Sequence, residues 1–432
     1  MTGKTNPFNI FITGASNGIG NCLAEMAGKA GHNVLTTGRS GGMLVKDLSD
    51  EDAPQVLAKF ARNADIAVLN AAIAPGVEVE LQLTVNLTRQ MQLALLLLKN
   101  NPNIKLAFVG SVISGAVIPS YPAYCAAKAG IAAFARALAA EFPGQILLYH
   151  PSGTQSKFME RSGVSSPGHL DSTAAVAGRL LTLIQKETYP WRRPATWKAW
   201  VIDWAAKLGL VLGPKPEPFD DGTTLVTGAG SGLGKALVSA DPSAIGMDIS
   251  GADVQGNILK DLPNLPRVDR LINCAGDTWT GPSTKMPYGK IEHLMEVNLL
   301  GPIKLEETLS PTQTIQISSL SHQIGYPFAA VYAATKSAIA TWGLCRGHLV
   351  VFPGPMNTPH AAAARLGGQP SRTISEPANV AKSVLAGSKK GLKQLVPGQQ
   401  NKILRIAGRL FPNITTAAFA RDQRRRLSQQ TN

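Results

Sequence analysis

Short apolar runs recur along the chain, and each ends in glycine or polar residues. In the first half these runs are NIFIT, NVLTT, IAVLN, LAFVG and ILLYH. Runs of this length and composition predict buried strands. Longer stretches with helical spacing lie between them, and we expect long helices over 78–99 and 122–141. Strands that alternate with helices in this way predict an α/β domain with a doubly wound, mainly parallel sheet.

The same order of elements returns in the second half. The stretches TTLVTGAGSGLG, SAIGMDIS and INCAGD repeat the first strand with its turn, the second strand and the fourth strand. Long helices are expected over 287–309 and 329–346. Matching landmarks lie 208 to 214 residues apart, which indicates a duplicated domain. We expect two Rossmann-type domains, with a first domain at 1–187, a linking segment at 188–220, a second domain at 221–398 and a basic tail at 399–432.

A glycine-rich turn with the spacing TGxxxGxG follows the first strand of each half. Such a turn lets the backbone approach a pyrophosphate, which the amides and dipole of the next helix then bind. We therefore expect a dinucleotide at both turns. The residues expected to hold it are Gly14, Ser16, Gly18, Ile19 and Gly20 in the first half, and Gly228, Ser231, Gly232, Leu233 and Gly234 in the second.

The residue at the end of the second strand differs between the halves. Arg39 stands there in the first half without an acidic neighbour, which suits the 2′-phosphate of NADP. Asp248 stands there in the second half, where a carboxylate accepts hydrogen bonds from ribose hydroxyls and repels a 2′-phosphate. The sequence therefore predicts NADP for the first domain and NAD for the second.

Each half also places a serine, a tyrosine and a lysine at the same spacing. Tyr124 and Lys128 are four residues apart, so on a helix they lie one turn apart on the same face. A neighbouring cation favours the phenolate and lowers a tyrosine pKa from about 10 towards neutrality. Ser111 lies 13 residues before Tyr124, at a strand end where a hydroxyl can hold a carbonyl group. The same spacing recurs at Ser319, Tyr332 and Lys336.

These motifs, present twice, resemble those of the short-chain dehydrogenase/reductase family, whose members are NAD(P)-dependent enzymes with a doubly wound sheet. In that family the serine positions the carbonyl, the tyrosine is the general acid or base, the lysine lowers the tyrosine pKa and holds the nicotinamide ribose, and an asparagine supports a proton-relay water. The resemblance implies the catalytic residues Asn86, Ser111, Tyr124, Lys128, Asn298, Ser319, Tyr332 and Lys336. It also implies cofactor contacts at Asp47, Asn70, Asn273, Gly276, Pro353, Gly354 and Thr358.

Some positions depart from the family pattern. Ala72 and Ser152 stand where the family has glycines beside the cofactor. In the second half only 17 residues separate the catalytic lysine from Pro353, against 23 between the equivalent residues of the first half. We expect the second catalytic helix to end about two turns early. That would disturb the subunit packing that is usual in the family.

Composition narrows the setting of the protein. A chain of 432 residues with 44% hydrophobic and 16% charged residues suits two globular domains. The four cysteines and seven histidines are scattered, which predicts a reducing, cytoplasmic location, no metal and no special role for the histidines. We also expect no signal peptide and no membrane span. The net charge of +14 favours anionic partners, and without a zinc-finger, RRM or KH signature nucleic acid is the weaker interpretation.

An amphipathic stretch lies between the halves. On a helical wheel one stripe holds Trp197, Trp200, Val201, Trp204 and Leu208. Two interpretations stay open: a helix that packs on its own domain or covers the substrate cleft, and an interfacial helix that touches a membrane. Because the basic tail also joins an apolar stripe to arginines, peripheral membrane contact is considered for 188–212 and 399–426.

The predicted function is the interconversion of a carbonyl and an alcohol by hydride transfer, at two sites, on a small and apolar substrate. The alternative is a Rossmann-fold binding or scaffold protein in which one or both halves lack turnover. The tight glycine spacing and the lack of a long substrate domain disfavour a sugar-nucleotide epimerase. An intrachain pseudo-dimer is expected, because the family commonly dimerises through the two helices that carry the asparagine and the tyrosine.

Overall fold

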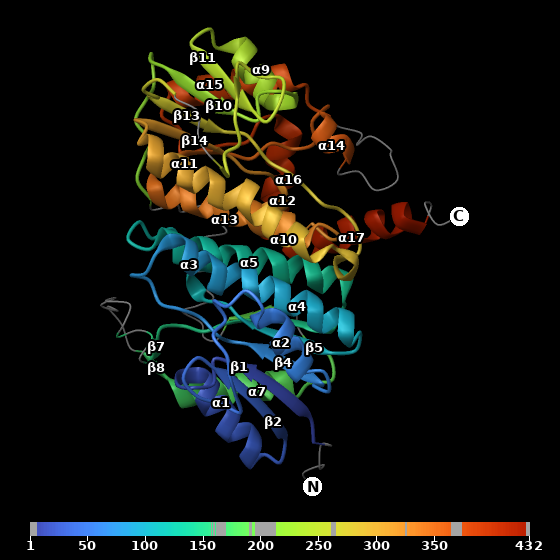
Figure 1. The fold of residues 1–432 in the computed structure, drawn as a ribbon. Coiled ribbons are helices and arrows are strands. Elements are labelled where there is room, and N and C mark those ends of the chain that lie inside the picture. The colour runs from blue at the N-terminus through green and yellow to red at the C-terminus, as the bar shows by residue number, and fades with distance from the viewer. Residues whose placement is uncertain are drawn as a thin grey trace.

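Two parallel sheets, each covered by helices, form the two halves of the molecule (Figure 1). The computed structural model describes residues 7–156, 158, 160, 170–189, 192–194, 213–260, 265–324, 326–363 and 374–428. The tryptophan stripe at 197–208 lies outside these residues.

In the first half, strands alternate with helices as expected. The strands of its sheet are β1 (Asn9–Thr13), β2 (Asn33–Gly38), β3 (Leu44–Val45), β4 (Ile66–Leu69), β5 (Lys105–Val109), β6 (Ile146–His150) and β9 (Arg192–Pro194). The helices are α1 (Gly18–Lys29), α2 (Ala53–Phe60), α3 (Val79–Leu83), α4 (Arg89–Asn100), α5 (Pro122–Glu141) and α7 (Thr173–Ile184). Two short strands, β7 (Thr154–Gln155) and β8 (Asp171–Ser172), pair beside the sheet. Strand β9 pairs with β6, so residues 192–194, which lie in the predicted linking segment 188–220, add a strand to the first sheet.

The second half repeats this plan. Its strands are β10 (Thr224–Thr227), β11 (Ala244–Asp248), β12 (Val254–Gln255), β13 (Arg270–Asn273), β14 (Gln313–Ile317), β15 (Leu349–Val351) and β16 (Gln394–Leu395). Its helices are α9 (Gly232–Ala240), α10 (Tyr288–Met295), α11 (Gly301–Leu309), α12 (Ser321–Ile324), α13 (Ala330–Arg346), α14 (Pro359–Ala363), α15 (Pro377–Lys389), α16 (Gln399–Leu410) and α17 (Pro412–Ser428). The strand orders are β3-β2-β1-β4-β5-β6-β9 and β12-β11-β10-β13-β14-β15-β16, with parallel pairing throughout. The predicted fold class is confirmed.

The central strands are buried on both faces, because helices cover both sides of each sheet. Alternate residues of β1 show this arrangement. Ile10 and Ile12 pack with Leu23 of α1 and Leu180 of α7, whereas Phe11 faces the helices α2, α4 and α5. The continuous apolar runs of the sequence follow from this two-sided burial.

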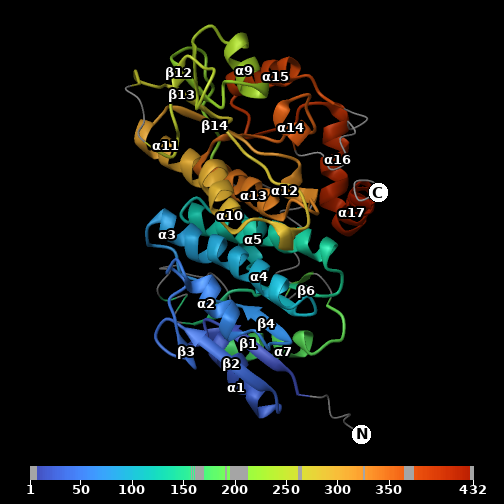
Figure 2. The same ribbon diagram turned by 45° about the vertical axis from the view of Figure 1, so that its right-hand side comes forward.

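The two halves meet through their long helices, so that α4 and α5 lie against α10 and α13 (Figures 1 and 2). One hydrophobic cluster runs through the contact and includes Phe134 of the first half and Trp342 of the second. Gly130 allows the close approach, because a Cβ there would lie 2.8 Å from a Leu87 methyl carbon and 3.2 Å from the Ala334 carbonyl oxygen. The halves therefore share part of one core.

Polar contacts at the edge of this interface fix how the helices are aligned. Arg89 is only 8% exposed, and its Nη1 lies 2.8 Å from an oxygen of Glu292 in the other half. Gln92 donates to the same Glu292 oxygen at 2.9 Å. Ser337 of α13 donates to the Ala129 carbonyl at 3.1 Å. A charge this deeply buried is tolerated because it is paired across the interface.

The expectation that the second catalytic helix ends two turns early is wrong. Helix α5 continues for 17 residues beyond Tyr124, and α13 continues for 14 beyond Tyr332. The difference is three residues, which is less than one turn. The remaining shortening falls in the connection before β15. The helices of the interface therefore keep their contact.

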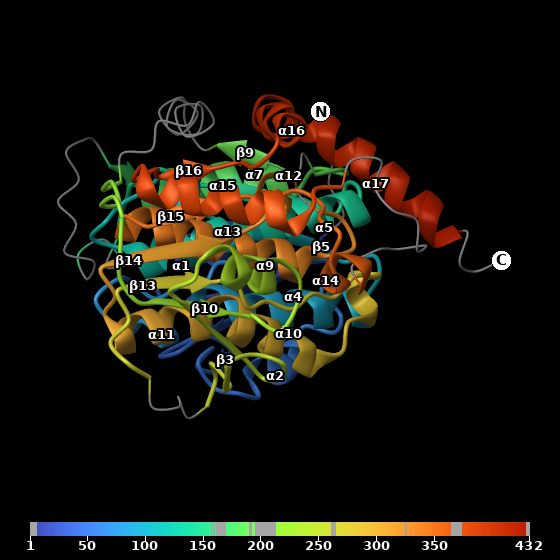
Figure 3. The ribbon, with the colours of Figure 1, turned by 90° about the horizontal axis from the view of Figure 1, so that it is seen from above.

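The stretch expected as a basic tail folds as two helices, α16 and α17, seen from above in Figure 3. Helix α16 packs on the second half, where the guanidinium of Arg405 lies 4.0 Å from the centre of the Phe352 ring. Helix α17 reaches the first half, where Arg424 donates to the Ala140 carbonyl. Among the described helices, none has the length and apolar character needed to cross a membrane.

Candidate active sites

The glycine-rich turns lead directly from the first strand of each half into the following helix. Gly14 has φ of +68° and Gly228 has φ of +70°, a left-handed conformation that favours glycine. A Cβ on Gly20 or on Gly234 would collide with the carbonyl oxygen of Gly14 or Gly228. Because α1 and α9 begin inside the turns, their first amides have no partner within the helix. Both turns thus have the geometry of an anion site.

The other residues expected at the turns divide into two groups. Ser16 stays at the turn, where its hydroxyl donates to the Gly41 carbonyl at 3.2 Å. Ser231 and Leu233 line the cavity of the second half together with Gly232. Ile19 instead packs against the core under α1.

The charged strand ends lie where the sequence placed them. Arg39 is exposed directly after β2, and Asp47 follows β3, where its carboxylate accepts from the Ser49 amide at 2.9 Å. Asp248 ends β11 and lines the cavity of the second half. One of its oxygens accepts from the Gly230 amide at 2.9 Å. Asp248 therefore joins its strand to the glycine-rich turn.

The asparagines at the ends of β4 and β13 are not equivalent, which corrects the sequence interpretation. Asn70 donates to the carbonyls of Thr13 and Gly14 and so holds the glycine-rich turn. The residue in its position in the second half is Cys274, whose amide, like that of Asn70, donates to the threonine that ends the first strand. Asn273 lies one residue earlier, points to the Pro302 carbonyl, and is not among the residues that line the cavity. Burial raises the pKa of Cys274 to about 12, so its thiol stays neutral.

The catalytic helices hold each tyrosine and lysine in the same arrangement. The Nζ of Lys128 lies 5.7 Å from the centre of the Tyr124 ring, and that of Lys336 lies 5.9 Å from the centre of the Tyr332 ring. Each ammonium group donates at 3.1 Å to a strand carbonyl, that of Val109 or Ile317. The helix and the adjacent strand thus position both lysines.

The expected lowering of the tyrosine pKa by lysine stays a prediction, because burial dominates the pKa values of these side chains in this structure. Burial raises the pKa of Tyr124, and it raises the pKa of Tyr332 to about 12, with the Ser319 hydroxyl acting in the lowering direction. Burial also lowers the pKa of Lys128 and Lys336 to about 8. In both pairs burial is the largest cause of the shift, because the side chains lose hydration.

Each predicted asparagine lies in a π-helical turn inside its long helix. Asn86 belongs to the turn Thr84–Thr88, and Asn298 belongs to the turn Glu296–Leu300. The carboxamide of Asn86 accepts from the Ile73 amide at 2.9 Å and donates to the Ile73 carbonyl at 3.0 Å. Asn298 makes the same pair of bonds to Asp277, both at 2.9 Å. Each asparagine thereby fixes the loop that leaves the fourth strand.

Gly276 has little room for a side chain. A Cβ on it would lie 3.1 Å from Oδ1 of Asn298 and 3.2 Å from the Nζ of Lys336. The equivalent residue of the first half is Ala72, and nothing in the structure explains this difference.

The backbone carbonyls of Ser111 and Ser319, the two serines predicted to be catalytic, are bound by histidines that the sequence analysis set aside. The Nδ1 of His150, at the end of β6, donates to the Ser111 carbonyl at 2.7 Å. In the second half Phe352 occupies that strand end, and His322 of α12 stacks on it and donates to the Ser319 carbonyl at 2.6 Å. The two halves thus fix the same carbonyl from different elements. The sequence could have indicated these two histidines, because His150 directly precedes Pro151 and His322 follows Ser319 by three residues.

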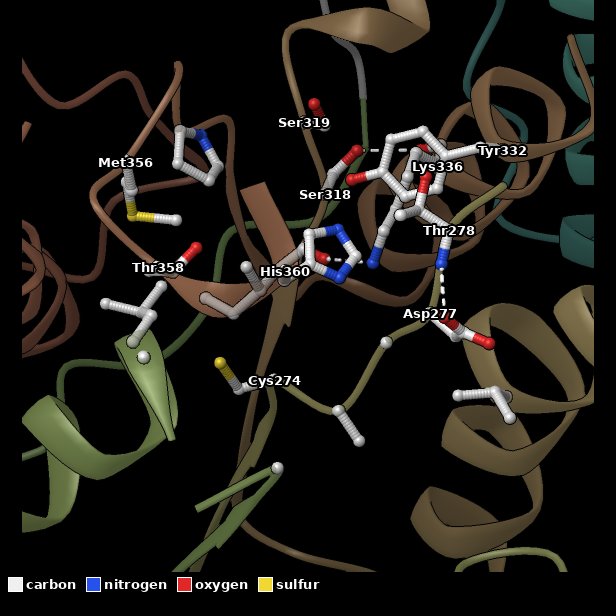
Figure 4. A pocket seen from close by; sticks show the side chains of 18 of the residues that line it. Cys274, Asp277, Thr278, Ser318, Ser319, Tyr332, Lys336, Met356, Thr358 and His360 are labelled. Carbon is white, nitrogen blue, oxygen red and sulfur yellow. Dashed lines mark hydrogen bonds between the residues drawn. The ribbon is translucent and has the colours of Figure 1, made fainter. Parts of the chain in front are cut away.

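A cavity of about 670 Å³ extends from the glycine-rich turn of the second half to its catalytic residues. Figure 4 shows Ser319, Tyr332 and Lys336 on one side and Cys274 and Thr358 on the other. Gly276, Pro353 and Gly354 also line it. Thr358 lies at the glycine-rich turn, 3.1 Å from where a Gly232 Cβ would be, and Ser156 lies at the equivalent place in the first half. The loop that follows the sixth strand of the sheet, β15, thus closes this end of the cavity.

His360 is a further lining residue that the sequence analysis missed. It lies between Tyr332 and the opposite wall in Figure 4, with ring centres 5.8 Å apart. Burial lowers the pKa of His360 to about 4, so the ring is neutral at physiological pH. In the first half Phe158 stacks against Tyr124 in the same way, at 5.5 Å. The sequence offered one indication that His360 lines the site, because it follows Thr358 by two residues.

The family model described as short chain dehydrogenase matches residues 9–162 and 239–346, together more than half of the chain. Among curated proteins, dehydrogenase/reductase SDR family member 7C of Xenopus tropicalis is 31% identical over 99 residues, which cover 21% of this chain and 31% of that protein. The 3-oxoacyl-(acyl-carrier-protein) reductase of Rickettsia conorii is 28% identical over 169 residues, which cover 33% of this chain and 67% of that protein. The chain thus spans about a third of the length of the first of these relatives.

Among solved structures, an N-terminal ketoreductase from a macrolactin assembly line has a TM-score of 0.58 at 12% identity. The match covers 92% of this chain and 88% of that one, which supports the fold of both halves together. The family model covers more than half of the chain, and both halves have the sheet, the glycine-rich turn and the Ser-Tyr-Lys cluster, so the chain belongs to the short-chain dehydrogenase family.

Proposed function

We propose that each half interconverts a carbonyl and an alcohol with a nicotinamide cofactor. The observation that carries the proposal is the repeated cluster: in both halves a serine at the end of a central strand and a Tyr-Lys pair on the long helix lie at the carboxyl ends of the strands, where α/β sheets bind ligands. A duplicated binding surface would not need the same buried lysine twice. Lys128 and Lys336 are 2% and 5% exposed.

The residues of the second half fit a dinucleotide. The cavity joins the glycine-rich turn, Asp248 and the catalytic tyrosine in one space of suitable size for a ligand. When bound, the cofactor would supply or accept a hydride. The hydroxyl of Ser319 would orient the carbonyl, Tyr332 would donate or take up the proton at the alcohol oxygen, and Lys336 would stabilise the charge that develops on the phenol.

We infer that the first half prefers NADPH and the second NADH, because Arg39 and Asp248 occupy the two strand ends. We further infer that the halves act as an intrachain pseudo-dimer, one ending with β9 and the other with β16. The contact of α5 with α13 supports this arrangement. In this arrangement the two halves bury, within one chain, the helix faces that two separate subunits would bury in a symmetric dimer.

The test is loss of one activity at a time. Tyr124→Phe should reduce the NADPH-linked rate by about 10²- to 10⁴-fold, and Tyr332→Phe should do the same to the NADH-linked rate. Cofactor fluorescence with a panel of ketones measures both rates, and cofactor binding by each variant controls for misfolding. If the wild-type chain binds cofactor but turns over no carbonyl, the scaffold interpretation replaces this proposal. If either change abolishes both rates, the halves share one site.

We also propose that α16 contacts an anionic membrane surface. Its buried residues are the polar Asn401 and Arg405 with Gly408, whereas Leu404 is its partly buried leucine and three of its other apolar side chains are exposed: Ile403, Ile406 and Leu410. The outward residues continue into α17 and are 46–68% exposed; they are Ile403, Ile406, Leu410, Phe411 and Ile414. A contiguous apolar stripe near many basic residues is typical of an interfacial helix.

Vesicle flotation tests this contact. The full chain should bind vesicles of phosphatidylserine and phosphatidylcholine, and Ile403→Ser with Ile406→Ser should abolish the binding while leaving turnover unchanged. The exposed Lys382→Ala on α15 is the control. Equal binding of wild type and the double variant contradicts the proposal. A serine-sensitive dimer in sedimentation without vesicle binding would identify a second copy of the chain as the occupant instead.

A further inference from the structure

The far wall of the second cavity is formed by the C-terminal helix α17, which lies outside the repeated domain. Its buried face follows helical spacing and contains Thr416, Ala420 and Gln423, with Phe419 partly buried beside them. Phe419 and Gln423 both line the cavity, together with Leu404 of α16. This helix therefore brings side chains to the site that the domain itself does not contain.

Two buried polar atoms on this side of the cavity have no hydrogen-bond partner among the described residues. One is Oε1 of Gln423, a residue 6% exposed, and the other is Oγ of Ser321 on α12, also 6% exposed. Both residues line the cavity. The Nε2 of Gln423 is engaged, because it donates to the Tyr326 hydroxyl at 3.5 Å. Buried polar atoms are rarely left unpaired, so the pair indicates a missing polar ligand group.

At three positions that line its cavity, the second site has a polar residue where the first half has an apolar one. Ser321 follows the catalytic serine by two residues, where the first half has Ile113. His360 stacks on the catalytic tyrosine where the first half has Phe158. Asp277, whose backbone is held by Asn298, stands where the first half has Ile73. These exchanges are apolar in the first half and polar in the second, so the two sites differ in the substrates that they suit.

We propose that Ser321 and Gln423 bind a hydroxyl group of the substrate, so that the second site acts on a hydroxylated ketone or the corresponding diol. A hydroxyl can donate to Oε1 of Gln423 while it accepts from the Ser321 hydroxyl, which satisfies both atoms. Leu404 and Phe419 beside them suit an apolar chain between this hydroxyl and the reacting carbonyl. The inference rests on the proposed function, in which Ser319 and Tyr332 hold that carbonyl.

The test compares methyl ketones with their ω-hydroxy derivatives of the same chain length, in the full chain. Binding is measured by titration in the Tyr332→Phe background with NADH present, so that it does not depend on turnover. The chain length that binds best should show a preference for the hydroxyketone of about tenfold or more, the worth of one well-placed hydrogen bond. Gln423→Leu and Ser321→Ala should each remove that preference and leave binding of the parent ketone unchanged. Gln400→Leu, an exposed glutamine on α16, should keep it.

The outcomes separate this inference from the proposed function. Equal binding of hydroxyketone and parent ketone at every chain length overturns the subsite, whatever the turnover. A preference that survives in both Gln423→Leu and Ser321→Ala also overturns it. If the preference is present and sensitive to both changes while the wild type reduces no ketone, the subsite stands and the proposed reaction fails.

Discussion

Lys336 shows how a single residue can serve a site at the expense of the fold. Burial lowers its pKa from the ordinary 10.5 to about 8, and its ammonium group donates to the Ile317 carbonyl. The ammonium therefore loses hydration that the structure replaces only in part. Lys128 is buried in the same way in the first half. This burial is what the chemical role proposed for the two lysines requires, and it is retained at a cost in stability.

Lys336→Met should therefore stabilise the chain while it reduces NADH-linked turnover. The folded lysine releases its proton near pH 8 and the unfolded one near 10.5, so the stability of the wild type rises with pH between these values. The advantage of the variant should be greatest below pH 8 and shrink towards pH 10.5. Thermal unfolding from pH 6 to pH 10.5 measures it, with the exposed Lys382→Met as control. A variant less stable than the wild type at pH 7 contradicts this account.

At the scale of elements, the carboxyl end of α5 supports a loop of the other half. Glu141 accepts from the Ser283 amide at 2.9 Å, from the Ser283 hydroxyl at 2.7 Å and from the Phe328 amide at 2.8 Å. Phe328 has φ of +63°, a strained conformation for a bulky residue. It lies between Tyr326 and Tyr332, which both line the second cavity. The first half thus holds part of the second site in shape.

Glu141→Gln should destabilise the chain and weaken NADH-linked turnover, because an amide group would face backbone donors. Burial raises the pKa of Glu141 to about 7, against the three donors and the charge of Arg424. Since the folded pKa lies above the ordinary 4.5, the stability that Glu141 adds is complete below pH 4.5 and is lost as pH rises through about 7. The melting-temperature difference between wild type and variant should therefore shrink from pH 5 to pH 8. Glu187→Gln, an exposed site, is the control, and a difference that does not change with pH would falsify this assignment.

How far the sequence predicts these elements depends on whether their signal is local. The strands, the glycine-rich turns and the Tyr-Lys spacing are local patterns, and all of them lie where expected. The partners of Glu141 could not be predicted from a local pattern, because Ser283 and Phe328 lie 142 and 187 residues away along the chain. The prediction that Asn273 contacts the cofactor failed for another reason. Cys274, one residue later, is the residue that lines the cavity, because a shift of one residue in a strand turns the side chain to the opposite face. Helix α17 was missed because its buried face consists largely of polar and small residues, Thr416, Ala420 and Gln423, and so shows little apolar periodicity.

At the scale of the whole molecule, the shared core decides how the two sites can be studied. The hydrophobic cluster that contains Phe11 and Phe134 continues to Ile303 and Trp342 of the other half. Separated halves would expose this surface to water, so their cofactor affinities would report on damaged domains. The cofactor preference of each half is better measured in the full chain, with the other site silenced by its Tyr→Phe change.

A chain with one NADPH site and one NADH site could reduce a carbonyl in one half and oxidise an alcohol in the other, because cells keep the two cofactors at different redox ratios. With Tyr332→Phe in place, the first site should use NADPH at least about tenfold better than NADH, a difference of ~1.4 kcal/mol. Arg39→Ala should remove that preference, because the 2′-phosphate loses its cation.

With Tyr124→Phe in place, the second site should prefer NADH. Asp248→Asn should relax that preference, since the neutral amide no longer repels the phosphate and keeps an oxygen for the Gly230 amide. Steady-state kcat/KM with each cofactor gives the answer, and equal preference in the two halves would remove the physical basis for coupling them.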